Sequence, residues 1–160
     1  MSDVIERDGF VFFWNGWPSQ WHPAEFTVDG VAYTCTEQFM MAEKARLFGD
    51  DETLRQILAT ASPREQKALG RQVRGFDADR WTAACRDVVH RGNVAKFSQN
   101  ADLKALLLAT GDKTLVEASP TDRIWGIGLA ADDRRATDRS AWRGKNWLGE
   151  ALMRVRADLR

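Results

Sequence analysis

TCTEQFMMAEKARLF, residues 34–48, follows a strand-like run and predicts the helix around which the chain is organised. Thr34 and Glu37 have the T-x-x-E spacing of a capping box, so we expect the helix to begin near Cys35. Glu37 and Lys44 are seven residues apart, which places them within about 20° of each other on one helix face. The apolar residues of the stretch could hold the helix in a core. The two charged residues then face either solvent or a pocket.

The composition is that of a soluble globular protein. Its 160 residues, 44% apolar and 29% charged, suit a single domain. Lys plus Arg and Asp plus Glu number 23 each, so no overall charge attracts nucleic acid or membrane, although a local basic groove remains possible. No apolar run approaches the roughly 20 residues needed to span a bilayer, and the first residues do not resemble a signal peptide. We therefore expect a cytoplasmic protein in which Cys35 and Cys85 are reduced thiols.

Strands are predicted at four places. The apolar run of residues 10–14 indicates a buried strand, and a loop with one Gly and two Pro follows at residues 15–23. Residues 26–33 predict a hairpin, because Asp29-Gly30 supplies the positive φ angles of a type I′ turn. Residues 114–118 predict a further strand, and residues 124–128 a strand end whose glycines allow close backbone approach.

Helices account for most of the remaining chain. Their predicted ranges are 51–60, 62 to about 73 with a Ser62/Glu65 capping box, 77 or 79 to 97, 101–110 capped by Asn100, and 146–159. Residues 130–143 are polar and irregular, which favours a mobile flap. The fold class is α+β and predominantly helical, with a small antiparallel sheet. We expect one domain over residues 1–160, with its core at about 10–156.

Common catalytic and metal-binding signatures are missing from the sequence. The two histidines, His22 and His90, are far apart and have no zinc-type spacing around them. No phosphate-binding glycine loop and no G-x-S-x-G elbow is present. Seven tryptophans stand against one tyrosine, and they either fill the core or form stacking walls for a planar ligand. The histidine spacing therefore predicts no zinc site.

Four polar residues in structurally unusual settings remain as candidates: Glu37 and Lys44 on one helix face, Asp122 in a turn, and Asn146 at the start of the last helix. Each has a purely structural alternative. Glu37 could be only the capping acid, Lys44 could be solvated or ion-paired, Asp122 could form an Asx turn, and Asn146 could cap its helix.

The order of several motifs resembles the NADAR (YbiA-like) family. Residues 36–45, TEQFMMAEKA, resemble its [ST]-E-[HQ]-x-x-x-[AG]-x-K motif, and residues 13–23 resemble its N-terminal F-S-N-F loop, with Gln20 and Trp21 in place of Asn and Phe. Residues 91–97 and 106–111 resemble its central helix pair. Residues 115–128, LVEASPTDRIWGIG, and 144–149, GKNWLG, resemble its D-x-x-W-G-x-G and G-x-N-x-L-G signatures. The resemblance extends from about residue 10 to 156.

This resemblance implies a YbiA-like fold and an N-glycosidase that needs neither metal nor redox cofactor. Family members are associated with hydrolysis of the ribosylamino-pyrimidine intermediates of riboflavin biosynthesis. Others remove ADP-ribose from the amino group of guanine in nucleic acid. Both substrates join ribose C1 to an exocyclic amine beside a flat heterocycle, and both carry phosphate.

The resemblance also implies roles for individual residues. Glu37 and Asp122 match the acidic positions, and we expect them to divide the stabilisation of charge at C1 and the protonation of the departing amine. Lys44 matches the motif lysine and is the candidate for a Schiff base at C1. Contacts to base, ribose and phosphate are expected from six further residues and the backbone of Gly128; the six are Trp81, Trp125, Gly126, Asn146, Arg71 and Lys96.

A binding module that holds ADP-ribose or NAD without turnover is the alternative. The presence of both acids and the lysine favours an enzyme. The zero formal net charge argues against a tight grip on long DNA, because non-specific affinity for DNA comes mainly from phosphate neutralisation. We therefore expect a small nucleotide-like substrate or an ADP-ribosylated guanine nucleotide or nucleic acid, and no membrane partner.

Overall fold

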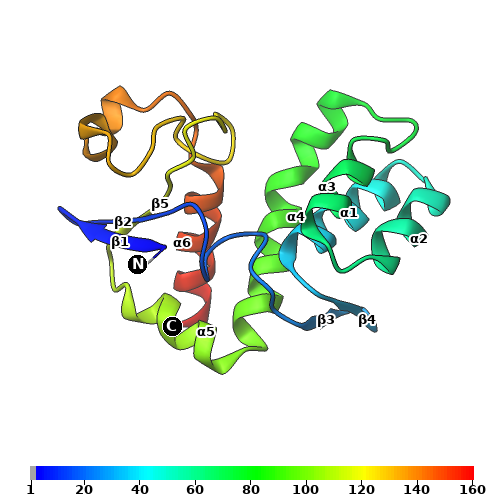
Figure 1. The fold of residues 1–160 in the computed structure, drawn as a ribbon. Helices are drawn as coiled ribbons and strands as arrows, with labels where there is room; N and C mark the ends of the chain where they lie inside the picture. Colours follow the sequence, from blue (N-terminus) through cyan, green and yellow to red (C-terminus); the bar gives the residue numbers. More distant parts are fainter. Residues whose placement is uncertain (1–2) are drawn as a thin grey trace. The chain divides into compact units, whose positions relative to one another are not determined.

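The computed structural model describes residues 3–160, which form two compact units (Figure 1). Residues 3–19 and 101–160 form the first, here called the strand unit, and residues 20–100 form the second, here called the helical unit. The fold class is α+β with helices predominating, as the sequence predicts. One domain over residues 1–160 stays a prediction. Within residues 3–160, no helix has the length and apolar character that a membrane crossing requires.

The sheet of the strand unit has the order β1-β2-β5, formed by Val4–Arg7, Phe10–Phe13 and Thr114–Glu117. β1 and β2 are antiparallel, whereas β5 joins β2 in parallel. Strand β1 was not predicted from the sequence. Its turn to β2 has φ angles of 54° at Asp8 and 83° at Gly9, so an Asp-Gly signal of the same kind as Asp29-Gly30 was present there.

Helix α6, Trp147–Leu159, packs on β5 in this unit, which also contains α5, Ala101–Ala109 (Figure 1). α6 forms where apolar residues recur at helical spacing, and Leu148, Leu152 and Val155 are fully buried. A Cβ at Gly149 would overlap the carbonyl oxygen of Leu115. Glycine there therefore allows the first turn of α6 to lie directly against β5.

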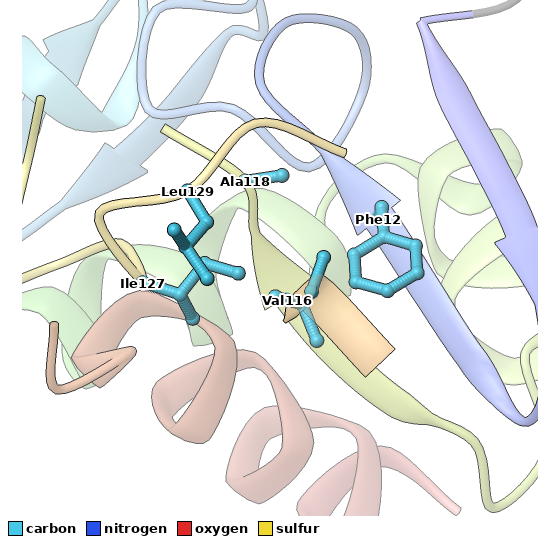
Figure 2. Close-up of a cluster of buried hydrophobic side chains, with 6 residues drawn as sticks. Phe12, Val116, Ala118, Ile127 and Leu129 are labelled. Atoms are coloured by element: carbon cyan, nitrogen blue, oxygen red, sulfur yellow. The ribbon is translucent and has the colours of Figure 1, made fainter. Parts of the chain in front are cut away.

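The core of the strand unit includes a cluster formed by Phe12, Val116, Ala118, Ile127, Leu129 and Ala136 (Figure 2). Ala136 belongs to the segment predicted as a flap, where two short 3-10 helices form: η1, Arg134–Thr137, and η2, Arg139–Ala141. Trp142 packs against the cluster and its indole N–H donates to the carbonyl of Ala136 at 2.8 Å. Residues 130–143 are thus anchored in the core by a few apolar side chains. Their mostly polar composition had predicted a mobile flap instead.

Residues 124–128 do not form the predicted strand end. One backbone bond, from Ile127 N–H to the Glu117 carbonyl at 3.0 Å, continues from β5. The carbonyls of residues 124–127 accept instead from N–H groups of residues 143–148, with Asn146 N–H donating to the Gly126 carbonyl at 3.1 Å. The strand prediction was wrong because these carbonyls pair with the segment that leads into α6 and not with a neighbouring strand.

The helical unit is built around α1, Thr36–Leu47, which packs against α2, Asp51–Ala59, α3, Pro63–Gly70, and α4, Ala78–Ser98 (Figure 1). The hairpin β3–β4, Phe26–Val28 and Val31–Tyr33, precedes α1, with φ angles of 50° at Asp29 and 79° at Gly30 as predicted. α4 continues through Gly92, where a Cβ would lie 2.7 Å from the Phe39 ring. This glycine permits the close approach of α1 and α4.

The predicted capping box at the start of α1 is absent. Cys35 is the N-cap residue without a side-chain capping bond, and the Glu37 N–H donates to the Gln20 carbonyl at 3.0 Å. The Thr34 side chain donates to Gln38, whose buried amide oxygen also accepts from the Thr34 N–H at 2.8 Å. The box fails because Gln38 and Gln20 satisfy the groups that Glu37 and Thr34 were expected to pair.

The box predicted at the start of α3 forms only in part. Ser62 accepts from the Glu65 N–H at 3.3 Å, but the Glu65 carboxylate accepts from the Thr60 hydroxyl at 2.6 Å. α3 also ends at Gly70 and not near Val73. A Cβ at Gly70 would overlap the Met41 side chain, so this end of α3 lies close against α1.

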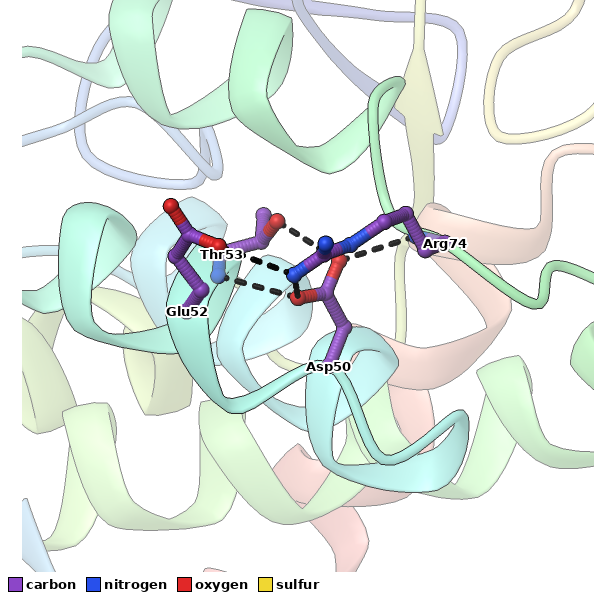
Figure 3. A network of polar contacts seen from close by, with 4 residues as sticks. All are labelled: Asp50, Glu52, Thr53 and Arg74. Atoms are coloured by element: carbon purple, nitrogen blue, oxygen red, sulfur yellow. Dashed lines mark hydrogen bonds and ion pairs between the residues drawn. The ribbon is translucent and has the colours of Figure 1, made fainter.

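A buried carboxylate joins α2 to the segment that precedes α4 (Figure 3). Asp50, whose side chain is 1% exposed, caps α2 by accepting from the N–H of Thr53 at 3.1 Å. It also accepts from the backbone N–H and the guanidinium of Arg74, at 2.9 and 3.0 Å. These bonds hold the pKa of Asp50 well below its usual range. The ionised group therefore fixes the chain two residues before Phe76.

Candidate active site

Lys44 lies on α1 beside two aromatic rings. Its Nζ atom is 4.7 Å from the centroid of the Phe76 ring and 5.8 Å from that of the Trp81 ring. Burial lowers the pKa of Lys44, Glu37 opposes that shift and Arg71 adds to it. A lysine with a lowered pKa has a larger fraction of neutral amine, which is the nucleophilic form.

Glu37 occupies the first turn of α1, two turns before Lys44, and is 7% exposed. It does not cap the helix, because Gln20 and Gln38 occupy the groups of the expected box. Its charge acts on Lys44. Glu37 and Lys44 were predicted to share one helix face, and Glu37 does interact electrostatically with Lys44.

Arg71 and Trp81 belong to the same group of residues. Arg71 directly follows α3, is exposed, and acts electrostatically on Lys44. Trp81 lies in the first turns of α4, is half-buried, and presents its ring to the lysine. Four of the residues selected from the sequence, Glu37, Lys44, Arg71 and Trp81, are therefore brought together within the helical unit.

Phe76 also belongs to this group, although it was not predicted from the sequence. It precedes Asp77, whose carboxylate caps α4 by accepting from the Arg80 N–H at 3.0 Å. Phe76 and Trp81 thus occupy the N′ and N4 positions, the spacing of a hydrophobic staple. That spacing was visible in the sequence, although nothing local indicated that the lysine of another helix would meet both rings.

Lys96 lies elsewhere in the helical unit, in the core. It is 0% exposed, and its Nζ atom is 5.0 Å from the Phe97 ring centroid. Burial lowers its pKa to about 7, and Cys35 weakly opposes the shift. Lys96 is therefore an interior residue of the helical unit, and its role as a ribose or phosphate contact stays a prediction.

Asp122 in the strand unit forms the Asx turn named above as its structural alternative. Its Oδ1 atom accepts from the N–H groups of Ile124 and Trp125, both at 2.9 Å. Its own N–H donates to the Ser119 hydroxyl at 3.0 Å. Trp125 is half-buried and packs edge-to-face on Trp147 at 5.8 Å. The carboxylate therefore shapes the turn that carries Trp125.

Asn146 and Gly126 are parts of the same framework. Asn146 is 2% exposed and has a φ of 54°. Its Oδ1 atom accepts from the Glu117 N–H at 3.0 Å, and its Nδ2 donates to the Leu115 carbonyl at 3.0 Å. A Cβ at Gly126 would lie 2.9 Å from the Glu117 carbonyl oxygen. The side-chain amide of Asn146 and the absence of a side chain at Gly126 thus both serve the backbone of β5, and their roles as ligand contacts stay predictions.

A pocket of about 510 Å³ lies between α1 and α4 in the helical unit. Trp81 lines it, and its charged residues are paired: Glu43 with Arg46 at 3.0 Å and with Arg91 at 3.6 Å, and Arg91 with Asp87 at 3.0 Å.

In residues 3–160 no cluster of three His, Cys, Asp or Glu residues is arranged to hold a metal ion.

The chain belongs to the NADAR domain family, whose profile matches residues 12–160. It is 42% identical to N-glycosidase R617 of Acanthamoeba polyphaga mimivirus, over 96% of this chain and 98% of that protein. It is 33% identical to N-glycosidase YbiA of Escherichia coli, over 82% and 74% of the two chains. The NMR structure of E. coli YbiA matches with a TM-score of 0.78 at 29% identity, covering 98% of this chain and 88% of that one. The family predicted from the motifs is confirmed.

Proposed function

We propose that this protein is an N-glycosidase that hydrolyses the bond between C1 of a phosphorylated or ADP-linked ribose and an exocyclic amine of a base. The observation that carries the proposal is the partly desolvated Lys44 beside Glu37 on α1. The names of the relatives R617 and YbiA support the reaction class.

The chemistry begins with opening of the ribosylamine to an imine at C1. The neutral amine of Lys44 adds to C1, a proton passes to the exocyclic nitrogen of the base, and the bond from C1 to that nitrogen breaks with its electrons leaving on the amine. A C1–Nζ iminium remains. Water adds to it, the C1–Nζ bond breaks, and the sugar leaves with a free C1 while Lys44 returns to its amine form.

Glu37 is the acid-base group in this proposal. It lies on the Lys44 face of α1, and its carboxyl group is nearly excluded from solvent. A carboxyl in that position can protonate the departing amine and then accept a proton from the attacking water.

The substrate belongs to one of two chemical classes, ribosylamino-pyrimidine phosphates of riboflavin biosynthesis or ADP-ribosylated guanine. Arg71 is the exposed cation of the Lys44 group, and it is our candidate for the phosphate. Trp81 offers a ring for the base. Roles of Asp122, Trp125, Gly126, Asn146 and Lys96 in substrate binding or catalysis stay predictions, as does a cytoplasmic location.

The test is turnover by Glu37→Gln on both substrate classes, with Glu43→Gln as the matched control on the same helix. We expect Glu37→Gln to lower kcat by ~10²–10⁴-fold, the range typical of a lost acid-base group. Glu43 points to Arg46 and Arg91, so its variant should retain turnover. Borohydride reduction during turnover should attach the sugar to wild-type protein and not to Lys44→Arg.

Two outcomes would contradict the proposal. Near-normal turnover by Glu37→Gln would remove the acid-base assignment. Tight binding of ADP-ribose or NAD without hydrolysis of either substrate would identify a binding module instead. Turnover without a borohydride adduct would leave an N-glycosidase that works without the covalent step.

A further inference from the structure

We propose that Phe76 is a positioning residue: with Trp81 it forms an aromatic clamp that holds the Lys44 nitrogen in its cationic form, first as ammonium and then as iminium. Only the part that concerns the iminium rests on the proposed function, because the ammonium form of Lys44 exists in the protein without substrate.

The position of Phe76 is fixed by a ring contact and by its two flanking chain segments. The Phe76 ring packs against Phe48 at 5.5 Å, tilted by 58°. Before it, Gly75 turns the chain with a φ of 77°, and Arg74 is bound to Asp50 by backbone and side chain. After it, Asp77 caps α4. The ring is nevertheless 48% exposed, so a large aromatic side chain is held at the surface over Lys44.

The physical role of the rings follows from their electrostatics. The face of an aromatic ring is negative and attracts a cation whose centre lies within about 6 Å of the centroid. Both rings meet that distance to Lys44 Nζ, at 4.7 and 5.8 Å. Lys44 loses its ammonium charge before it attacks, but the iminium that forms next carries a positive charge on the same nitrogen. The clamp therefore stabilises that intermediate as well.

The charged groups that act on Lys44 are Glu37, on its own helix, and Arg71, after α3. α4 presents the Trp81 ring, and the turn before α4 presents Phe76. Burial and Arg71 disfavour the cation, whereas Glu37 and the two rings favour it. The clamp thus opposes the effects of burial and Arg71, which favour the neutral, nucleophilic amine. It also lowers the free energy of the cationic covalent intermediate.

A hydrophobic staple by itself would not require aromatic residues. Aliphatic side chains at positions 76 and 81 would cover the start of α4 equally well. An aromatic ring is needed only if residue 76 also attracts the Lys44 cation. Replacement of Phe76 with leucine separates these two roles, because leucine keeps the apolar cover and removes the ring.

The experiment is an NMR titration of lysine carbons in substrate-free protein, with the Lys44 signal assigned by its loss in Lys44→Arg. Phe76→Leu removes the ring face and keeps apolar cover, so the Lys44 midpoint should fall by about half a pH unit. Phe76→Ala admits water and should raise the midpoint toward that of a solvated lysine. Phe76→Tyr keeps the ring and should leave the midpoint unchanged.

Trp21→Leu is the matched control. It removes a ring that lies 5.9 Å from a different lysine, Lys67, and should not move the Lys44 midpoint. An unchanged midpoint in Phe76→Leu, or equal shifts in the leucine and alanine variants, would overturn the clamp. These titrations need no substrate, so failure of the clamp is distinct from failure of the N-glycosidase.

A second measurement addresses the iminium. With substrate present, Phe76→Leu should reduce the borohydride-trapped adduct severalfold, whereas Phe76→Tyr should trap as wild type does. Equal trapping in the leucine and wild-type proteins would limit the clamp to the ammonium form and overturn its proposed role at the intermediate.

Discussion

The two units use their motif residues in opposite ways. In the strand unit, Asp122 and Asn146 direct polar atoms at backbone groups of their own unit, where they hold a turn and join α6 to β5. In the helical unit, Glu37 and Lys44 take no part in capping α1, and Lys44 lies beside two aromatic rings. The first arrangement stabilises an irregular segment, and the second surrounds a partly buried lysine with rings and charged groups.

This difference has a measurable consequence. Substitution of a residue that satisfies buried backbone groups should lower the free energy of unfolding. Substitution in the Lys44 group should change activity or ionisation with little loss of stability. The following predictions test that separation.

Asn146→Ala should have the largest effect on stability. It leaves the Glu117 N–H and the Leu115 carbonyl without their partner, and alanine is disfavoured at a φ of 54°. We expect a loss of ~2–4 kcal/mol in urea unfolding. Asn146→Gly separates the two causes, because glycine accepts this φ but makes neither bond. A loss below ~1 kcal/mol in both variants would contradict the framework role.

Lys96 should make stability rise with pH. Its pKa in the folded protein is about 7, below that of an unfolded lysine, so the unfolded chain binds more protons from pH 7 up to about pH 10. The unfolding free energy should therefore gain ~2 kcal/mol between pH 6 and 8.5 from this group. Lys96→Met should lose that part of the slope in urea titrations. An identical slope in both proteins would show that the interior lysine does not titrate in this range.

Asp122 should give the smallest change in stability and the sharpest test of the comparison. Asp122→Asn keeps an oxygen acceptor for the N–H groups of Ile124 and Trp125, whereas Asp122→Ala removes it. We expect losses of less than ~0.5 kcal/mol and ~1–2 kcal/mol, respectively. If Asp122 is also the second acid, Asp122→Asn lowers kcat ~10²-fold although the protein remains stable. Unchanged kcat in this variant would assign the carboxylate to the turn alone.

Much of the fold was predictable because its signals are local. The apolar spacing of α6 and the Asp29-Gly30 turn were read correctly from neighbouring residues, and α1 begins at the expected place although its predicted capping box is absent. The segment 124–128 was read incorrectly because its carbonyls bond to residues about 20 positions away, at 143–148. The anchoring of residues 130–143 was missed because it depends on a few apolar side chains, among them Ala136 and Trp142, in an otherwise polar segment.

The candidate site was predictable to a similar extent. The period of the helix alone places Glu37 and Lys44 on one face, and the motif pattern pointed to the family that the comparisons confirm. The pattern did not distinguish a residue that acts on the Lys44 nitrogen from one that supports the backbone, since Glu37 and Asp122 are both acidic residues in motifs of the family.

The sequence by itself determined the family, the fold class and the shared face of Glu37 and Lys44, because these depend on residue order and helical spacing. Only the tertiary structure showed that Gln20 and Gln38 accept the N–H bonds of the expected capping box, so that Glu37 does not cap α1. It also showed that Lys96 is interior and that the Phe76 ring lies against Lys44. The reason is physical: helix and turn preferences act over a few neighbouring residues. Burial and the electrostatic setting of a side chain arise instead from segments that are distant in the chain.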